Sequence, residues 1–260
     1  MERNFKLVVA YDGTDFHGWQ RQLGVRTVQA ELEAVLQRVL RHPLHLAGAS
    51  RTDAGVHAHG QVASVVTSSS IPVENLARAL GSRLPPDTAL VSATVVPLEF
   101  HASRDACGKL YRYRVFNARR RPVETLAQRY VWHVWHPLDL ERMCAAAAAL
   151  VGTHDFAAFR TSRDERPNTE RTLSQVVLEE LSPRVLSVVV DGNAFMHNMV
   201  RILVGTLVDV ARDVLPEGTI ASALQATERA VAGQTAPAHG LTLQHIDVAL
   251  PADAGASWPP

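Results

Sequence analysis

The stretch LHLAGASRTDAGVHAHGQVASVV, residues 44–66, consists of two apolar segments separated by a polar, glycine-containing loop. Residues 44–49 and 61–66 are each typical of a β-strand, so the stretch predicts two strands in succession. The flanking sequence adds a strand at 5–11, a helix from the N-cap Thr27 to about residue 41, a short helix after Pro72 and a strand at 88–96. This order is the split βαβ pattern of ferredoxin-like folds.

The second part of the chain repeats this order of elements, although no repeat is visible at the level of residues. Its expected elements are a strand at 109–117, a helix opened by Pro137, a hairpin around Ser182-Pro183, a long helix at 194–214, a short helix near 217–230 and a strand at 241–249. We therefore predict an α+β protein of two ferredoxin-like, RRM-like halves, with antiparallel sheets packed side by side and helices on one face. The predicted boundaries are 1–104, 105–250 and a loose tail at 251–260.

Composition indicates a water-soluble globular protein, because 47% of the residues are hydrophobic and 20% are charged. We expect neither a signal peptide nor a membrane span, since no apolar run is long enough for either. The two cysteines, Cys107 and Cys144, are not spaced as a metal-binding pair. They suit a reducing compartment, so a cytoplasmic protein without a disulfide framework is predicted.

Positive charge is concentrated in residues 104–129, which contain eight basic and two acidic residues although the whole chain has a net charge of zero. Such clustering predicts an anionic partner that binds on one side, such as a nucleic acid. Of the 26 basic residues, 24 are arginines, whose planar guanidinium suits phosphate. A GC-rich genome explains the arginine excess equally well.

Two tyrosines alternate with two arginines in the predicted strand at 109–117. Tyr111 and Tyr113 would share one face of that strand, and Arg112 and Arg114 the other. An aromatic face beside basic residues suits the stacking of RNA bases. An ordinary alternation of buried and exposed residues explains the pattern as well.

The sequence gives little support for a metal site or for nucleotide binding. His57 and His59 form a possible pair of metal ligands, but no third ligand stands at a recognisable spacing. They are interpreted as hydrogen-bonding loop residues, and no metal is predicted. The chain also has no nucleophile elbow, phosphate-binding loop or dinucleotide fingerprint.

Asp53 is the one acidic residue in the loop, and a lone aspartate in such a turn is usually a turn former. Arg201 lies in a predicted helix that is otherwise apolar, on one face with His197, and a buried guanidinium needs a carboxylate partner. We predict that Arg201 pairs with Asp53 across the two halves and holds it ionised. A snorkelling surface arginine is the alternative.

The absence of a second carboxylate beside Asp53 bears on the type of reaction. A glycosidase normally needs two carboxylates. A reaction that breaks a glycosidic bond without water, and then joins the same base again, needs only one. Such an isomerase is one hypothesis, and its rivals are a glycoside or nucleoside hydrolase and a non-catalytic RNA-binding module.

Seven segments from residue 11 to residue 248 resemble the tRNA pseudouridine synthase A family in sequence and in order. They are YDGTDFHGWQRQ (11–22), GASRTDAGVHAHGQV (48–62), FHAS (100–103), KLYRYRV (109–115), HDFAAFR (154–160), NAFMHNMVRILVG (193–205) and GLTLQHIDV (240–248). The resemblance implies isomerisation of uridine to pseudouridine at positions 38, 39 and 40 of the tRNA anticodon arm. It also implies a homodimer with each tRNA lying across both subunits, and no cofactor or metal.

The resemblance further implies a role for each of four residues. Asp53 would be the catalytic carboxylate and Arg201 its basic partner, while Arg51 would stabilise the flipped-out nucleotide and Tyr111 would pack against the target uracil. Both covalent addition to the sugar and proton abstraction from it remain open for the carboxylate. The sequence departs from the family at Ala58, where glycine is usual, and at Gly81, where asparagine is usual.

Overall fold

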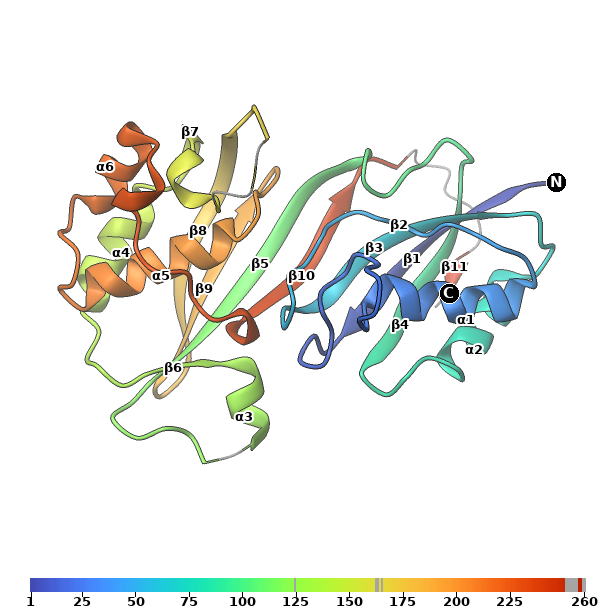
Figure 1. The fold of residues 1–260 in the computed structure, drawn as a ribbon, viewed down its shortest axis with the longest axis horizontal. Helices are drawn as coiled ribbons and strands as arrows, with labels where there is room; N and C mark the ends of the chain where they lie inside the picture. Colours follow the sequence, from blue (N-terminus) through green and yellow to red (C-terminus); the bar gives the residue numbers. More distant parts are fainter. Residues whose placement is uncertain (124, 162–163, 165, 251–256, 259–260) are drawn as a thin grey trace. The chain divides into compact units, whose positions relative to one another are not determined.

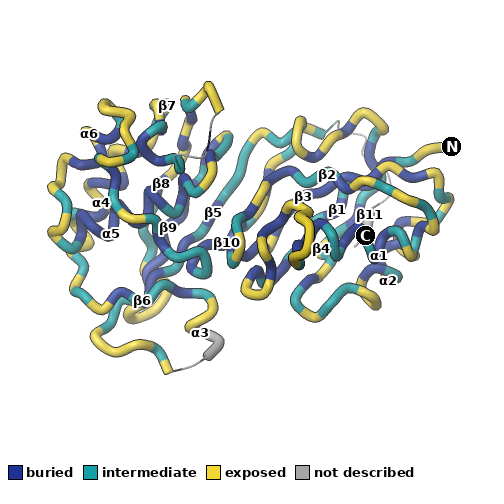
Figure 2. The backbone as a smooth tube through the Cα atoms, viewed as in Figure 1, coloured by how far each residue is buried: buried dark blue, intermediate teal, exposed yellow. Residues whose placement is uncertain are grey.

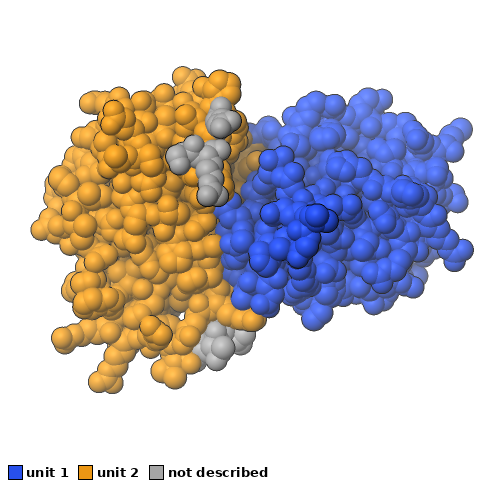
Figure 3. Space-filling model, in the orientation of Figure 1, with its two compact units in different colours: residues 1–107, 243–260 blue, residues 108–242 orange. Residues whose placement is uncertain are grey.

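The computed structural model describes residues 1–123, 125–161, 164, 166–250 and 257–258. These residues form a mixed α+β protein with six α-helices, as the sequence predicted at the level of fold class (Figure 1). The chain divides into two compact units (Figure 3). Unit 1 comprises residues 1–107 and 243–260, and unit 2 comprises residues 108–242.

The sheet of unit 1 has the strand order β11-β4-β1-β3-β10, with β2 also paired to β3. The strands are β1 (Arg3–Tyr11), β2 (Ala47–Gly48), β3 (His57–Thr67), β4 (Thr88–Val96), β10 (Leu241–Val248) and β11 (Ser257–Trp258). β1 is antiparallel to both β3 and β4, and β2 is antiparallel to β3. Two helices, α1 (Val28–Leu40) and α2 (Val73–Gly81), pack against each other. The predicted order of elements up to residue 96 is therefore confirmed.

The strand predicted at 44–49 is wrong in its length, because only Ala47 and Gly48 pair with β3. The backbone of Leu46 is bound to side chains of α1 instead. Its N–H donates to Glu33 Oε1 at 3.1 Å, and its carbonyl accepts from Gln29 Nε2 at 2.9 Å. At Leu46 the predicted strand is thus bonded to α1 rather than to the sheet.

Unit 2 contains the antiparallel strand order β5-β9-β8-β7, and β6 pairs in parallel with the end of β5. Its elements are β5 (Ala106–Asn117), α3 (Thr125–Tyr130), β6 (Trp132–Val134), α4 (Leu140–Ala148), β7 (Gly152–Asp155), β8 (Glu170–Ser182), β9 (Val185–Gly192), α5 (Met199–Ala211) and α6 (Thr219–Ala226). Short 3-10 turns lie at Ala157–Phe159, Arg229–Val231 and Ala238–Gly240. The β8–β9 hairpin turns where the sequence predicted it. α3, β6 and β7 were not predicted from the sequence.

The long helix predicted at 194–214 begins only at Met199, so this prediction is wrong at its N-terminal end. Asn198 adopts a left-handed backbone with φ of 61°, which interrupts helical geometry. The N–H of His197 donates to the side chain of Asp164 rather than to a helical carbonyl. His197 therefore lies outside the helix, and the expected shared helix face with Arg201 does not form.

The buried residues follow the sheet strands and the inner faces of the helices (Figure 2). None of the helices in the described residues is long and apolar enough to cross a membrane. The loose tail predicted at 251–260 lies outside the described residues, apart from Ser257–Trp258, which pair with β4.

Candidate active site

Asp53 lies half-buried in a tight turn between β2 and β3. The N–H of Val56 donates to the carbonyl oxygen of Asp53 at 3.1 Å, which closes the turn. Gly55 occupies its third position with φ of 78°, a conformation that residues with a Cβ rarely adopt. Thr52 is buried and Arg51 is exposed, so successive side chains of the loop point to different environments.

Side chains from the sheet hold the start of this loop. Gln61 on β3 accepts from the N–H of Ser50 at 3.2 Å and donates to its carbonyl at 2.8 Å. The hydroxyl groups of Tyr11 and Thr52 are 2.8 Å apart and share a hydrogen bond. The residues before Asp53 are therefore fixed to the sheet by hydrogen bonds that are themselves buried.

The segment that follows β1 holds the same loop from its other side. Trp19 donates its N–H to the carbonyl of Thr52 at 3.0 Å, and Gly55 donates its N–H to the carbonyl of Phe16 at 3.2 Å. A Cβ on Gly18 would lie 2.6 Å from the carbonyl oxygen of Thr52, so only glycine fits there without a shift. The motifs at 11–22 and 48–62, far apart in sequence, thus form one structural unit around Asp53.

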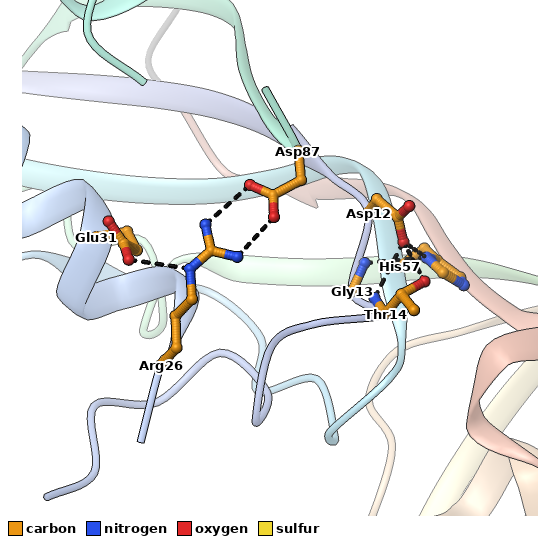
Figure 4. A network of polar contacts seen from close by, with 7 residues as sticks. All are labelled: Asp12, Gly13, Thr14, Arg26, Glu31, His57 and Asp87. Carbon is orange, nitrogen blue, oxygen red and sulfur yellow. Dashed lines mark hydrogen bonds and ion pairs between the residues drawn. The ribbon is translucent and has the colours of Figure 1, made fainter. Parts of the chain in front are cut away.

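His57 ties the end of the loop to the turn after β1 (Figure 4). The N–H of Gly13 donates to His57 Nδ1 at 3.0 Å, so this ring nitrogen acts as an acceptor. Asp12 Oδ1 lies 3.1 Å from the same nitrogen and accepts from the N–H and hydroxyl of Thr14. His57 forms hydrogen bonds as predicted, but it is the first residue of β3 rather than a loop residue. No group of three metal-ligating side chains occurs within the described residues.

Arg26 anchors the C-terminal end of the segment between β1 and α1, residues 12–27, which contacts the Asp53 loop (Figure 4). Its guanidinium binds Asp87 with both terminal nitrogens, at 2.6 and 3.0 Å, and Glu31 through Nε at 3.0 Å. The same group lies over the ring of Phe16, 4.1 Å from the centroid. The hydrogen bond to Asp87, followed by the one to Glu31, raises the pKa of Arg26. The arginine therefore stays charged and keeps the segment in place.

In unit 2, Tyr111 lies on β5 and is buried, with its ring edge-to-face against Phe195 at a centroid distance of 5.1 Å. Tyr113 donates its hydroxyl to the carbonyl of Pro237 at 2.7 Å, and burial raises its pKa. A Cβ on Gly240 would lie 2.5 Å from its ring. The predicted alternation of two tyrosines and two arginines on opposite faces is confirmed. Tyr113 is a core residue of unit 2.

Arg201 lies in the first turn of α5 and is held by two contacts within unit 2. Its Nε donates to the carbonyl of Ala236 at 2.8 Å, and Nη1 donates to Asn198 Oδ1 at 2.6 Å. These bonds give the guanidinium a fixed orientation, unlike a snorkelling side chain. Its pairing with Asp53 would join the two units and stays a prediction.

Asp164 fixes part of the polar segment between the 3-10 turn at Ala157–Phe159 and β8. It is buried, and its carboxylate accepts from Arg166 Nε at 2.8 Å and from the N–H of His197 at 2.9 Å. The hydrogen bond from Arg166, with a smaller contribution from His197, holds the pKa of Asp164 below its usual range. The carboxylate thereby connects this loop to the segment that precedes α5. Residues 162, 163 and 165 of this segment lie outside the described part.

The family model described as tRNA pseudouridine synthase matches residues 7–104 and 146–247, which is more than half of the chain. The chain belongs to the tRNA pseudouridine synthase family. It is 41% identical over 244 residues to tRNA pseudouridine synthase A of Acetivibrio thermocellus, covering 94% of this chain and 99% of that relative. The enzyme of the same name from Thermoanaerobacter sp. is 42% identical with the same coverage. That of Halalkalibacterium halodurans is 43% identical over 237 residues, covering 90% of this chain and 89% of the relative.

Family membership confirms the resemblance that the seven sequence motifs indicated. It also confirms the prediction of an isomerase that forms pseudouridine in tRNA. The matched residues include the whole Asp53 loop and the segment that covers it. Arg201 lies within the second matched range, whereas Tyr111 lies between the two ranges.

Sequence reasoning missed the side chains that hold the synthase's loop. Gln61, Arg26 and Asp87 each act through a partner distant in sequence, and Arg26 and Asp87 are 61 residues apart. No local pattern marks such pairs. A polar residue within an apolar predicted strand, such as Gln61, is the one sequence signal that could have indicated a bonded partner.

Replacement of Gly13 by alanine is expected to destabilise the loop. The added Cβ would lie 2.0 Å from the backbone carbonyl oxygen of Val56, which cannot rotate away as a flexible side chain could, so the two segments must separate. We expect a loss of about 1–3 kcal/mol in the free energy of unfolding. Denaturant unfolding measures it, and Gly24→Ala serves for comparison because nothing lies within 4 Å there, although its φ of 77° adds strain. Equal stability of Gly13→Ala and the unchanged protein would contradict the contact.

Replacement of Asp164 by asparagine is expected to lower stability at pH 7 by about 1–3 kcal/mol, because charge-assisted hydrogen bonds are lost. The folded-state pKa of Asp164 is depressed, so its contribution is present above the unfolded pKa of about 4 and is lost as pH falls through the folded value. The difference between the two proteins should therefore shrink below about pH 4. Unfolding midpoints measured from pH 3 to pH 8 test this, and a difference independent of pH would contradict it.

Proposed function

We propose that this protein converts uridine to pseudouridine at positions 38, 39 and 40 in the anticodon arm of tRNA, with Asp53 as the catalytic carboxylate. The observation that carries the proposal is the fixed Asp53 loop. Thr52, on one side of Asp53, is held by Tyr11 and Trp19, and Gly55, on the other, is held by Phe16. A half-buried carboxylate on so rigid a turn is suited to act at a defined atom of a bound nucleotide.

The target uridine must leave the helical stack before a side chain can reach its glycosidic bond. Flipping a nucleotide out costs a few kcal/mol, which contacts with the protein offset. Arg51 is exposed two residues before Asp53, which suits contact with the flipped-out nucleotide. Tyr111 would pack against the uracil ring and hold it during the reaction.

The reaction exchanges one bond between base and sugar for another. The N1–C1′ bond breaks, the uracil turns within the pocket, and C5 bonds to C1′; C5 then loses a proton and N1 gains one. Substrate and product are isomers, so no water is consumed and no second carboxylate is required to activate it. Asp53 acts either by adding to C1′ or by removing the proton of C2′ and returning it. Exclusion of water keeps the detached base from being lost.

Arg201 would serve this chemistry as the ion-pair partner of Asp53. A guanidinium beside a carboxylate favours its ionised form, which both routes need. The hydrogen bonds of Arg201 to Ala236 and Asn198 fix the orientation of its guanidinium within unit 2. An ion pair between Arg201 and Asp53 would therefore link the catalytic loop to α5.

The finer organisation is part of the same proposal. It comprises two ferredoxin-like halves, residues 1–104 with the catalytic loop and residues 105–250, in a cytoplasmic homodimer that holds each tRNA across both subunits. The two departures from the family motif, Ala58 and Gly81, are compatible with this activity. Ala58 is buried in the β1–β3 ladder opposite Tyr11, and nothing lies within 4 Å of a Cβ built on Gly81.

Incubation of the purified protein with unmodified tRNA, followed by digestion to nucleosides, tests the reaction type. We expect each uridine lost to appear as pseudouridine, with no free uracil. Release of uracil together with abasic sites would identify a hydrolase and contradict the proposal.

A further inference from the structure

We propose that unit 2 carries a second RNA-binding surface, in which Trp135 stacks on an unpaired nucleobase of the tRNA while Arg119, Arg120 and Arg121 bind adjacent phosphates. We call these four residues, with His136, the Trp135 surface. The inference rests on the proposed function, because it concerns the same tRNA substrate. It extends that function to a part of the RNA other than the target base.

The first observation is an exposed aromatic stack. Trp135 follows β6 directly, and 58% of its surface is exposed. Its ring lies 3.6 Å from that of His136 between centroids, with an angle of 31° between the planes. The chain around β6 is largely exposed or partly exposed (Figure 2). A large flat apolar ring kept in solvent is suited to stacking, which contributes to binding for any base because every base has a π-face.

The second observation is that the backbone on both sides of Trp135 is fixed. Asn117, the last residue of β5, donates from Nδ2 to the carbonyl of Val134 at 2.8 Å and to that of His136 at 2.7 Å. His133 Nε2 lies 2.8 Å from the carbonyl of Ala118, within hydrogen-bonding distance. The aromatic stack is therefore ordered before any ligand arrives, which lowers the entropic cost of binding.

The third observation is the charge beside the stack. Arg119, Arg120 and Arg121 are all exposed and directly follow Ala118. Arg184, in the β8–β9 turn, lies at the same end of the sheet, because its carbonyl accepts from the N–H of Asn117 at 2.7 Å. Within the described residues, none of these four guanidinium groups forms an ion pair. Guanidinium groups without carboxylate partners suit phosphate oxygens.

The location within unit 2 separates this surface from Tyr111, the residue proposed to pack against the target uracil. Tyr111 and Asn117 both lie on β5, and the six-residue separation corresponds to about 20 Å along a strand. An RNA base stacked on Trp135 is therefore not the base that packs against Tyr111. A second copy of this chain fits the surface less well, since a two-fold contact would bring the arginines of both copies together.

Three variants and a control separate these possibilities. They are Trp135→Ala, Trp135→Phe, the triple change Arg119→Gln, Arg120→Gln and Arg121→Gln, and a control that removes equal charge from unit 1 through Arg38→Gln, Arg78→Gln and Arg83→Gln. Binding of unmodified full-length tRNA is measured at several salt concentrations, with kcat and KM for pseudouridine formation. Light scattering gives the oligomeric state of each variant.

We expect Trp135→Ala to weaken tRNA binding by roughly 5- to 100-fold, and Trp135→Phe to retain most of the affinity. The triple arginine variant should reduce the slope of log K against log salt by about 2 to 3, and the control by less than 1. KM should rise in the first and third variants, while kcat at saturating tRNA stays within about twofold, because the contact is made equally in ground and transition states.

Unchanged binding in both Trp135→Ala and the triple arginine variant would overturn the proposal. So would a change in oligomeric state on Trp135→Ala, which would identify the surface as an interface between copies. An equal loss of binding in the control variant would show a general charge effect and would also overturn it. Failure of the proposed function would give a different result. The unchanged protein would bind tRNA through this surface but would form no pseudouridine.

Discussion

An Asp53→Asn variant is expected to form pseudouridine at least about 10³-fold more slowly than the unchanged protein while binding tRNA with similar affinity. Asparagine has nearly the same shape as aspartate but is neither nucleophilic nor basic, so the chemical step fails on either route. The turn should persist, because it is closed by the carbonyl of residue 53 rather than by its side chain. Single-turnover assays and equilibrium tRNA binding measure the two effects separately.

The matched control for this variant is Asp247→Asn on β10. That carboxylate is exposed and has His245 at 3.6 Å, so its replacement should leave turnover unchanged. Near-normal turnover of Asp53→Asn would exclude Asp53 as the catalytic group. Unchanged biological function in the same variant would favour the rival interpretation, a non-catalytic RNA-binding module.

An Arg201→Met variant is expected to lower kcat by about 10²- to 10³-fold with a smaller effect on tRNA binding. Methionine removes the positive charge that would orient and stabilise the reacting carboxylate of Asp53. A purely structural role of Arg201 would instead lower the thermal stability together with the activity.

Arg201→Lys provides the control for charge. Lysine keeps the positive charge but cannot reproduce two hydrogen bonds from different guanidinium nitrogens to Ala236 and Asn198. We expect an intermediate loss of kcat, because the charge is kept and the two hydrogen bonds are not. Thermal unfolding of both variants shows whether the packing of α5 is preserved. Near-normal turnover of Arg201→Met would rule out the pairing as essential.

The periodicity of apolar residues, and the residues typical of helix starts and turns, were sufficient to predict much of the fold. The apolar stripe of α1, its extended N-cap Thr27 and the hairpin at Pro183 are local features, and each lies where the sequence predicted it. The errors arose where tertiary bonds compete with local preference. Leu46 bonds to side chains of α1, and His197 bonds to Asp164, so neither joins the element that its neighbours form.

The candidate site likewise has residues that the sequence identified and contacts that it did not. Asp53 and Arg51 stand in a recognisable motif, and the structure places Asp53 at the start of a tight turn of unit 1 and Arg51 two residues before it. What makes the turn rigid is the set of contacts from Gln61, Trp19 and Phe16, which come from segments before and after it in sequence. Such contacts depend on the folded sheet and have no signature in a single stretch of residues.

Position-by-position mapping of pseudouridine in unmodified tRNA, after incubation with the purified protein, tests the central claim most directly. We expect conversion of uridines at positions 38, 39 and 40 of the anticodon arm and none elsewhere, with the same positions unconverted by Asp53→Asn. Conversion confined to other positions, or no conversion of any uridine at 38–40, would contradict the proposed substrate.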